Sequence, residues 1–162
     1  MAQNNAEILI RSARLSDADD LVAFNRAMAQ ETENRILSAE VISAGVRNLF
    51  QHPEWGFYIV AESDGRMVGC LMITYEWSDW RNGLFWWIQS VYVPPEFRRR
   101  GIYRKMYDYV QNAALKVGNV CGLRLYVERD NRIAQKTYRK LGMSKTNYIL
   151  FETTELAKRT NK

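Results

Sequence analysis

The segment from residue 84 to residue 117 constrains this chain more than any other. Apolar and aromatic residues at 84–93 predict a strand, and Pro94 and Pro95 end it because neither can donate to a ladder. After a basic loop, apolar residues between Ile102 and Val117 recur at helical spacing, and Gly118 follows as a fitting cap. The sequence therefore predicts a strand that leads through a positively charged loop into a helix.

The charge of the chain is concentrated in this loop. The 162 residues carry 23 Lys and Arg against 18 Asp and Glu, a net charge of +5. Five of the cations gather at the expected helix start: Arg98, Arg99, Arg100, Arg104 and Lys105. Cations destabilise the first turn of a helix, whereas its free N–H groups attract anions. We interpret the loop as an anion-binding site, with a solvated run of arginines as the alternative.

The remaining pattern predicts a single domain over residues 1–162, with an ordered core at about 8–152. The strand, helix and strand around the basic loop imply a parallel pair, whereas the short turn at 63–65 implies an antiparallel hairpin. The fold class is α/β (α+β), with a mixed central sheet of about six strands and helices on both faces. The other expected elements are strands at 8–11, 57–62, 66–75, 123–127 and 148–152, helices after Ser16, at 38–50 and at 131–141, and a polar loop at 76–82.

Several classes of protein are excluded by residue counts. Cys70 and Cys121 lie far apart and His52 is the one histidine, so we expect no metal site and no disulfide, but two buried thiols. No apolar run reaches the roughly 20 residues of a membrane span, and the first residues do not form a signal peptide. We therefore expect a cytoplasmic protein that does not bind membranes. One short basic cluster is too narrow for a nucleic-acid-binding stripe.

The loop sequence Arg98-Arg99-Arg100-Gly101-Ile102-Tyr103 resembles the hallmark of the GNAT superfamily of acetyl-CoA-dependent N-acetyltransferases. That hallmark is Arg or Gln, two residues, Gly, one residue, then Gly or Ala, so Tyr103 stands where the family has a small residue. The residues from Ile10 to Leu21 are similar to the family's first strand and helix, and those from Asn131 to Met143 to its second motif. The resemblance implies a GNAT-like fold and an N-acetyltransferase that uses acetyl-CoA as acyl donor.

The resemblance also implies roles for particular residues. Main chain at Val91, Tyr92 and Val93 would pair with the pantetheine arm and stabilise the oxyanion. Tyr138 would protonate the departing thiolate, with simple core packing as the alternative. No covalent acyl-enzyme is expected. The remaining cofactor-binding residues that it implies are Arg98, Arg99, Arg100, Gly101, Ile102, Tyr103, Arg104 and Asn131.

The base and the acceptor pocket are less constrained by the sequence. Residues 69–93 are similar to the spermidine/spermine acetyltransferase branch, whose fourth-strand carboxylate falls at Gln89 here. Glu76 is our candidate base; Asp79, Glu33 or an ordered water are alternatives, as is an ordinary solvated acid. Trp77 and Trp80 beside Glu76 and Asp79 would form a pocket for a cationic amine, or else serve packing.

The expected function is acetyl transfer from acetyl-CoA to a primary amine of a small molecule or peptide. The alternative is a non-catalytic acyl-CoA-binding regulatory domain, which Gln89 and Tyr103 motivate. The expected partners are acetyl-CoA and an amine acceptor, and not nucleic acid. An exposed strand edge near the C-terminus also suggests a homodimer.

Overall fold

A computed structural model describes residues 7–154 of the chain, which divides into two compact units, Met1–Tyr126 and Val127–Lys162. The first unit holds a five-stranded sheet with three helices, and the second holds one helix. The strands are β1 Leu9–Ser12, β2 Gly56–Ser63, β3 Arg66–Ser78, β4 Gly83–Tyr92 and β5 Val120–Leu125. The helices are α1 Ala18–Glu33, α2 Ala39–Gln51, α3 Ile102–Val117 and α4 Arg132–Lys140.

The sheet is mixed, as the sequence predicts. Its strands follow the order β1-β2-β3-β4-β5. Successive strands from β1 to β4 pair antiparallel, whereas β5 pairs parallel with β4. Five strands form instead of about six, because residues 148–152 are in no strand. A run of apolar side chains is present there, but a strand exists only where a neighbour satisfies its backbone groups. The homodimer through a strand edge stays a prediction.

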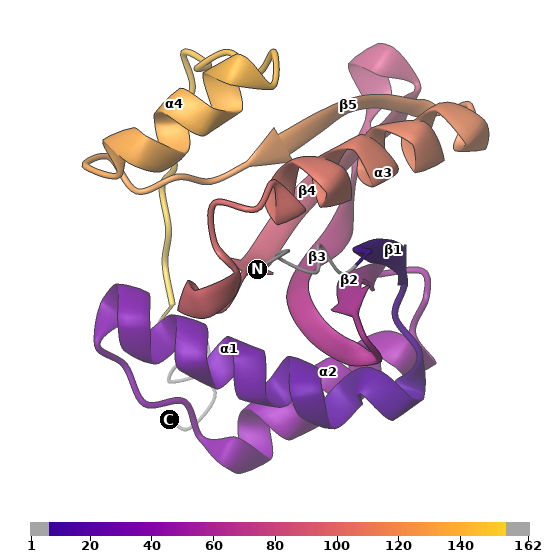
Figure 1. Cartoon of the computed structure of the whole chain (residues 1–162). Coiled ribbons are helices and arrows are strands. Elements are labelled where there is room, and N and C mark those ends of the chain that lie inside the picture. Colours follow the sequence, from indigo (N-terminus) through magenta and orange to yellow (C-terminus); the bar gives the residue numbers. More distant parts are fainter. Residues whose placement is uncertain (1–6, 155–162) are drawn as a thin grey trace, which may run out of the picture. The chain divides into compact units, whose positions relative to one another are not determined.

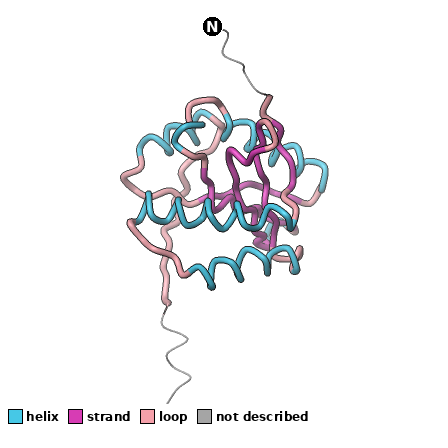
Figure 2. Tube along the Cα trace, turned by 60° about the horizontal axis from the view of Figure 1, so that its bottom comes forward, coloured by secondary structure: helices cyan, strands magenta, loops and turns pink. Residues whose placement is uncertain are grey.

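Helices cover both faces of the sheet (Figure 1). On one face α1 and α2 supply Leu21 and Val46 to a core that also holds Tyr58, Val60 and Cys70 from the strands. The opposite face is packed against α3. There a Cβ added to Gly69 would stand 3.0 Å from the Ile102 side chain, so a larger residue would require Ile102 to shift. The strand layer, magenta in Figure 2, thus lies between helical layers within the first unit.

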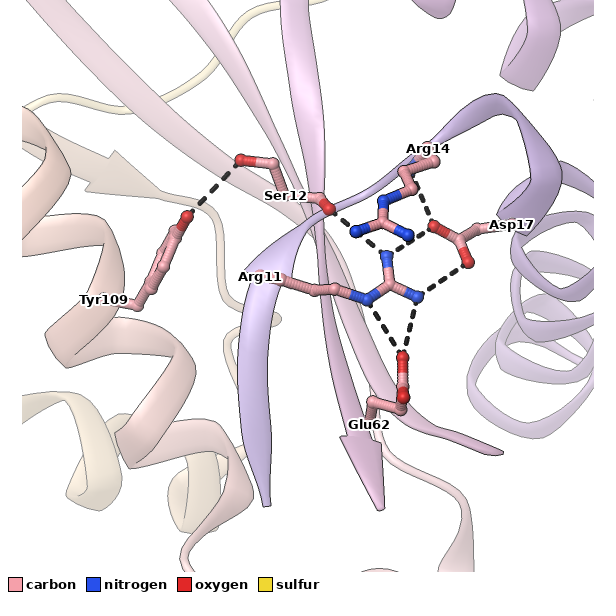
Figure 3. Close-up of polar contacts among 6 residues, drawn as sticks. All are labelled: Arg11, Ser12, Arg14, Asp17, Glu62 and Tyr109. Atoms are coloured by element: carbon pink, nitrogen blue, oxygen red, sulfur yellow. Dashed lines mark hydrogen bonds and ion pairs between the residues drawn. The ribbon is translucent and has the colours of Figure 1, made fainter. Parts of the chain in front are cut away.

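Arg11 joins β1, β2 and the start of α1 (Figure 3). Its Nη atoms donate to both carboxylate oxygens of Asp17 at 2.7 and 2.9 Å, and its Nε donates to Glu62 at 2.9 Å. The backbone N–H of Arg14 also donates to Asp17, at 2.6 Å. The Arg11 guanidinium therefore holds the pKa of the Asp17 carboxyl below its usual value.

These contacts also correct the expected start of the first helix. Ser16 lies inside a short 3-10 turn, Leu15–Asp17, and Asp17 is the residue that precedes α1. The helix expected directly after Ser16 therefore begins at Ala18, after a turn in which the carboxylate of Asp17 accepts from the N–H of Arg14. The second helix begins as its sequence predicts, since Ser38 accepts a hydrogen bond from the N–H of Val41.

The third strand is longer than its sequence predicts. Glu76 pairs with Phe85 and Ser78 with Gly83, so the ladder continues through residues expected in a loop. The connection is a single 3-10 turn, Asp79–Arg81. Because Glu76 is a strand residue, its side chain has a fixed face of the sheet and defined neighbours.

The described residues hold neither a membrane-spanning helix nor a cluster of metal-ligating side chains. No helix within residues 7–154 combines the length and apolarity that crossing a bilayer requires. The same residues contain no group of three or more His, Cys, Asp or Glu arranged to hold a metal ion. Cys70 and Cys121 are free thiols, but only Cys70 is buried, because Cys121 lies on the edge strand β5. The expected burial of Cys121 is therefore wrong.

Candidate functional site

The start of α3 combines a left-handed turn with a helix end that no described side chain caps. Arg99 and Gly101 both have left-handed backbone conformations, with φ of 61° and 74°, and Gly101 directly precedes the helix. In the described chain no side chain caps α3, and its first turn carries no acid. The N–H groups of that turn therefore lack the partners that a capping residue would supply. Tyr103, in the same turn, has its ring 6.4 Å from the ring of Tyr107.

Arg98 is held within the protein. Its guanidinium pairs with the carboxylate of Glu31 on α1 at 2.7 Å, and its Nε donates to the carbonyl of Val93 at 2.8 Å. The ion pair keeps the pKa of Glu31 below its usual value. Arg98 thus ties the basic loop to α1 and to the end of β4, a contact that orders the loop.

The neighbouring arginines differ from Arg98. Among the described residues, Arg99, Arg100 and Arg104 form no ion pair. Arg100 lies over the ring of Phe97, 5.3 Å from its centroid. Three cations therefore stand at the positive end of a helix without an acidic partner, which is unfavourable unless an anion binds.

The two parallel strands separate next to this loop. The last pair of the β4–β5 ladder is Ile88 with Leu125, although β4 continues to Tyr92. From residue 89 onward, no β5 residue in the described ladder pairs with β4. The main chain of these residues presents a free strand edge, which an extended molecule can join as an added strand.

A bulge lies in the same stretch of β4. Met72 pairs with Gln89 and Cys70 with Tyr92, so two residues of β4 oppose one residue of β3. Ser90 adopts a left-handed conformation with a φ of 49°. A bulge bends its strand and leaves a residue outside the ladder, so it turns backbone groups of β4 away from β3.

Polar residues continue along the face of the sheet that α1 and α2 cover. Ladder partners share a face, so Gln89 lies with Met72, and the next pairs along the ladder are Thr74 with Trp87 and Glu76 with Phe85. The side-chain amide of Gln89 donates to the hydroxyl of Thr74. Gln89 is thereby oriented beside the point at which β4 and β5 separate.

Both carboxylate oxygens of Glu76 accept hydrogen bonds from side chains. Arg124 on β5 donates to Oε1 at 2.6 Å, and the indole N–H of Trp87 donates to Oε2 at 2.6 Å. The ring of Trp87 stacks on Tyr126 with centroids 4.4 Å apart. Glu76 is therefore engaged in an ordered cluster rather than presented as a solvated acid.

The other predicted acceptor residues are dispersed. Trp77 and Trp80 are exposed, at 58% and 86%, and Asp79 accepts a hydrogen bond from the backbone N–H of Trp80. Trp86 is buried on the opposite face, where its ring packs against Phe57. No ring contact or ion pair among the described residues joins Trp77 or Trp80 to Glu76 or Asp79.

The second unit carries the remaining candidates on α4. Asn131 precedes the helix and its side-chain oxygen accepts from the N–H of Ala134 at 3.0 Å, as the sequence predicts. Tyr138 is partly buried, and burial raises the pKa of its hydroxyl above 10. The phenol is therefore protonated at neutral pH and able to donate a proton.

Two of these side chains, Glu31 and Arg124, were not among the sequence candidates. Glu31 is separated from Arg98 by 67 residues, and no local pattern joins them. Arg124 could have been found from the sequence, because it interrupts the apolar residues Leu123 and Leu125 of a predicted strand and so lies on the opposite face from them. Its neighbours become visible only when the register of β5 against β4 is known.

Comparison with known proteins places the chain among the acetyltransferases. The model of the Acetyltransferase (GNAT) family matches residues 18–143, which is most of the chain. The chain therefore belongs to the GNAT family and is an acyltransferase.

Individual relatives agree with this assignment. The chain is 27% identical over 157 residues to an N-alpha-acetyltransferase of Sulfurisphaera tokodaii, covering 91% of this chain and 87% of the relative. It is 44% identical to a possible acetyltransferase from Clostridium difficile 630 whose crystal structure is known. The two structures match with a TM-score of 0.85 over 91% of this chain and 97% of the other. A predicted acetyltransferase from Clostridium acetobutylicum, whose structure was solved with acetyl-CoA, shares the fold at 20% identity. The match has a TM-score of 0.75 and covers 93% of this chain and 98% of the other.

Proposed function

We propose that the protein transfers the acetyl group of acetyl-CoA to the amine of a small molecule or peptide by direct attack. The observation that carries this proposal is the separation of β4 and β5 after Ile88 and Leu125. It leaves Val91, Tyr92 and Val93 with an open main-chain edge on which a pantetheine arm could lie as an added strand. The acetyl-CoA complex of the Clostridium acetobutylicum neighbour supports the choice of donor.

The basic loop is the proposed site of the coenzyme A pyrophosphate. The backbone N–H groups of the first turn of α3, at Ile102, Tyr103 and Arg104, would donate to the phosphate oxygens, and Gly101 forms the left-handed turn that precedes them. The Ile102 side chain is buried, so only its backbone would take part. Arg99, Arg100 and Arg104 would neutralise the charge, while Arg98 holds the loop through Glu31.

The reaction requires two proton transfers. The amine nitrogen attacks the acetyl carbonyl carbon, the C–S bond breaks, and the thiolate that leaves must receive a proton. We assign that proton to Tyr138, whose raised pKa keeps it protonated until the thiolate forms. A main-chain N–H of Val91, Tyr92 or Val93 would stabilise the oxyanion.

The acceptor must also lose a proton before it attacks. Glu76 is the base predicted from sequence, but its two oxygens accept from Arg124 and Trp87. We therefore propose that Glu76 orders its neighbours, and that a water held by the amide oxygen of Gln89 passes the proton of the ammonium to bulk solvent, which leaves the neutral amine to attack. Cys70 takes no part, since burial raises the pKa of its thiol to about 12.

The proposal is tested by mixing the protein with acetyl-CoA and a panel of polyamines, amino acids and aminoglycosides. Release of free thiol together with an acetylated product, identified by mass spectrometry, is the expected result. Tight binding of acetyl-CoA without thiol release for any amine would instead identify a non-catalytic acyl-CoA-binding domain.

Arg100→Ala is expected to raise the Kd of acetyl-CoA about 3- to 30-fold, because a charge-assisted contact to a phosphate is lost. The kcat at saturating acetyl-CoA should change little, since the loop does not touch the reacting atoms. Calorimetric titration measures the Kd. Arg66→Ala, at an exposed arginine that begins β3, is the matched control. An unchanged Kd for Arg100→Ala would remove the pyrophosphate assignment.

A further inference from the structure

Arg124 is oriented on the sheet face beside the separation of β4 and β5. It pairs with Trp87 across the parallel ladder, and the next pair, Ile88 with Leu125, is the last before β4 continues alone. Gln89 lies two residues beyond Trp87, about 7 Å along the strand. The guanidinium extends from there back along β4, over the ring of Phe85, so it lies on the same sheet face as Gln89 but toward the start of the strand.

The head of Arg124 is held from two directions. Its central carbon lies 3.5 Å from the centroid of the Phe85 ring, a stacking contact, and its Nη1 is bound to Glu76. Gly122 makes room for Phe85: a Cβ at Gly122 would come within 2.6 Å of the ring. Such a support fixes the plane of the guanidinium, which is the arrangement that recognises a carboxylate by two parallel hydrogen bonds.

The Arg124 fork retains donors for a ligand. Within the described residues only Nη1 has a hydrogen-bond partner, and the side chain is 26% exposed. A second cation, Arg81, lies over the same Phe85 ring at 5.1 Å and has no ion pair in the described chain. The acid of this cluster, Glu76, is already neutralised by Arg124. Among the described residues of this cluster, the one acid is therefore already paired and does not offer a polyamine a free negative charge.

We propose that Arg124 binds a carboxylate of the acceptor, so that the substrate is an amine that also carries a carboxylate. This inference rests on the proposed acetyl transfer and names the class of its acceptor. Glu76 is the positioning residue that aims Arg124. The carboxylate can come from a free amino acid or from an acidic residue beside the amino terminus of a peptide.

The experiment compares matched acceptors with the full chain and acetyl-CoA. Glycine and β-alanine are each paired with their amides, spermidine serves as an acceptor without a carboxylate, and two peptides begin with Asp or Asn. We expect kcat/KM to favour the carboxylate member of at least one pair. The free amino acids and the peptides then distinguish the two sources of the carboxylate.

Arg124→Gln should raise the KM of the preferred carboxylate acceptor about 10- to 100-fold, and should change the KM of its amide less than threefold. Arg124→Lys keeps the charge but loses the fork, so we expect an intermediate loss. Arg66→Gln is the control for the removal of one positive charge. Circular dichroism establishes that each variant is folded, and Arg124→Lys carries the test if Arg124→Gln does not fold.

Binding gives a readout that does not need turnover. Because Trp87 contacts the same Glu76, tryptophan fluorescence of the acetyl-CoA complex should change on titration with the carboxylate amine, and Arg124→Gln should abolish the change. Equal preference for acids and amides, or an equal rise of both KM values in Arg124→Gln, would overturn the inference while acetyl transfer stands. Failure to acetylate any amine would refute the proposed function, and the titration would then decide the carboxylate site alone.

Discussion

Tyr138→Phe is expected to lower kcat about 10²- to 10⁴-fold and to leave the Kd of acetyl-CoA within about twofold of the wild type. The substitution removes one oxygen and retains the ring, so packing of α4 changes little. Without the phenol, the thiolate leaves unprotonated or takes its proton from water. The effect should therefore be on the chemical step and not on binding.

Steady-state kinetics at saturating acceptor, with calorimetric titration of acetyl-CoA, measures both quantities. Tyr148→Phe is the matched control, because Tyr148 lies in the same unit and its side chain is exposed. Because burial raises the pKa of Tyr138 above its usual value, the hydroxyl is protonated at neutral pH, and loss of this proton should lower kcat only in solutions more alkaline than an ordinary tyrosine requires. Turnover of Tyr138→Phe equal to that of the wild type would leave Tyr138 as a packed aromatic.

The helices and the basic loop could be predicted from sequence because their determinants are local. Pro94 and Pro95 end a strand, Gly101 supplies a left-handed residue, and apolar residues at helical spacing follow. Each of these signals acts within a few residues of the element that it sets. The anion site at the start of α3 follows from the same local features, so its residues were accessible without a structure.

The ends of the strands depend on partners that are distant in sequence. Glu76 reads as a loop residue by itself, but Phe85 on the returning strand extends the ladder to include it. Residues 148–152 have the apolar, aromatic composition of a buried strand and are in none. Periodicity reports which side chains are apolar, whereas a ladder requires a neighbour at the right distance, and single-sequence reasoning cannot supply that neighbour.

The role of Glu76 shows the same dependence at the site. A carboxylate near a strand end is a reasonable base, and nothing in the nearby sequence contradicts that interpretation. Its partner Arg124 is 48 residues away, and the pair forms because β5 is parallel to β4 with Trp87 opposite Arg124. The register of β5 against β4 therefore decides whether Glu76 is a free carboxylate on this face of the sheet or is paired with the guanidinium of Arg124.

Arg11→Met is expected to lower the free energy of unfolding by about 3 kcal/mol, because it leaves Asp17 and Glu62 without the cation between them. The side chain of Asp17 is only 12% exposed, so water replaces the lost contacts poorly. Urea denaturation measures the change. Arg47→Met is the control: its pair with Asp19 is largely exposed, and its loss should cost less than about 1 kcal/mol. Equal losses in the two variants would show that burial of the Arg11 contacts adds nothing.

The same contacts predict a pH dependence. The pKa of Asp17 is lower in the folded chain than its value of about 3.9 in the unfolded chain. The stabilisation is therefore complete above about pH 5 and is lost as the pH falls through the unfolded value toward the folded one. Asp17→Asn removes this part of the dependence, so its unfolding free energy should fall less steeply below about pH 4 than that of the wild type. Parallel curves for the two proteins in urea titrations between pH 5 and pH 3 would show that Asp17 titrates alike in the folded and unfolded states.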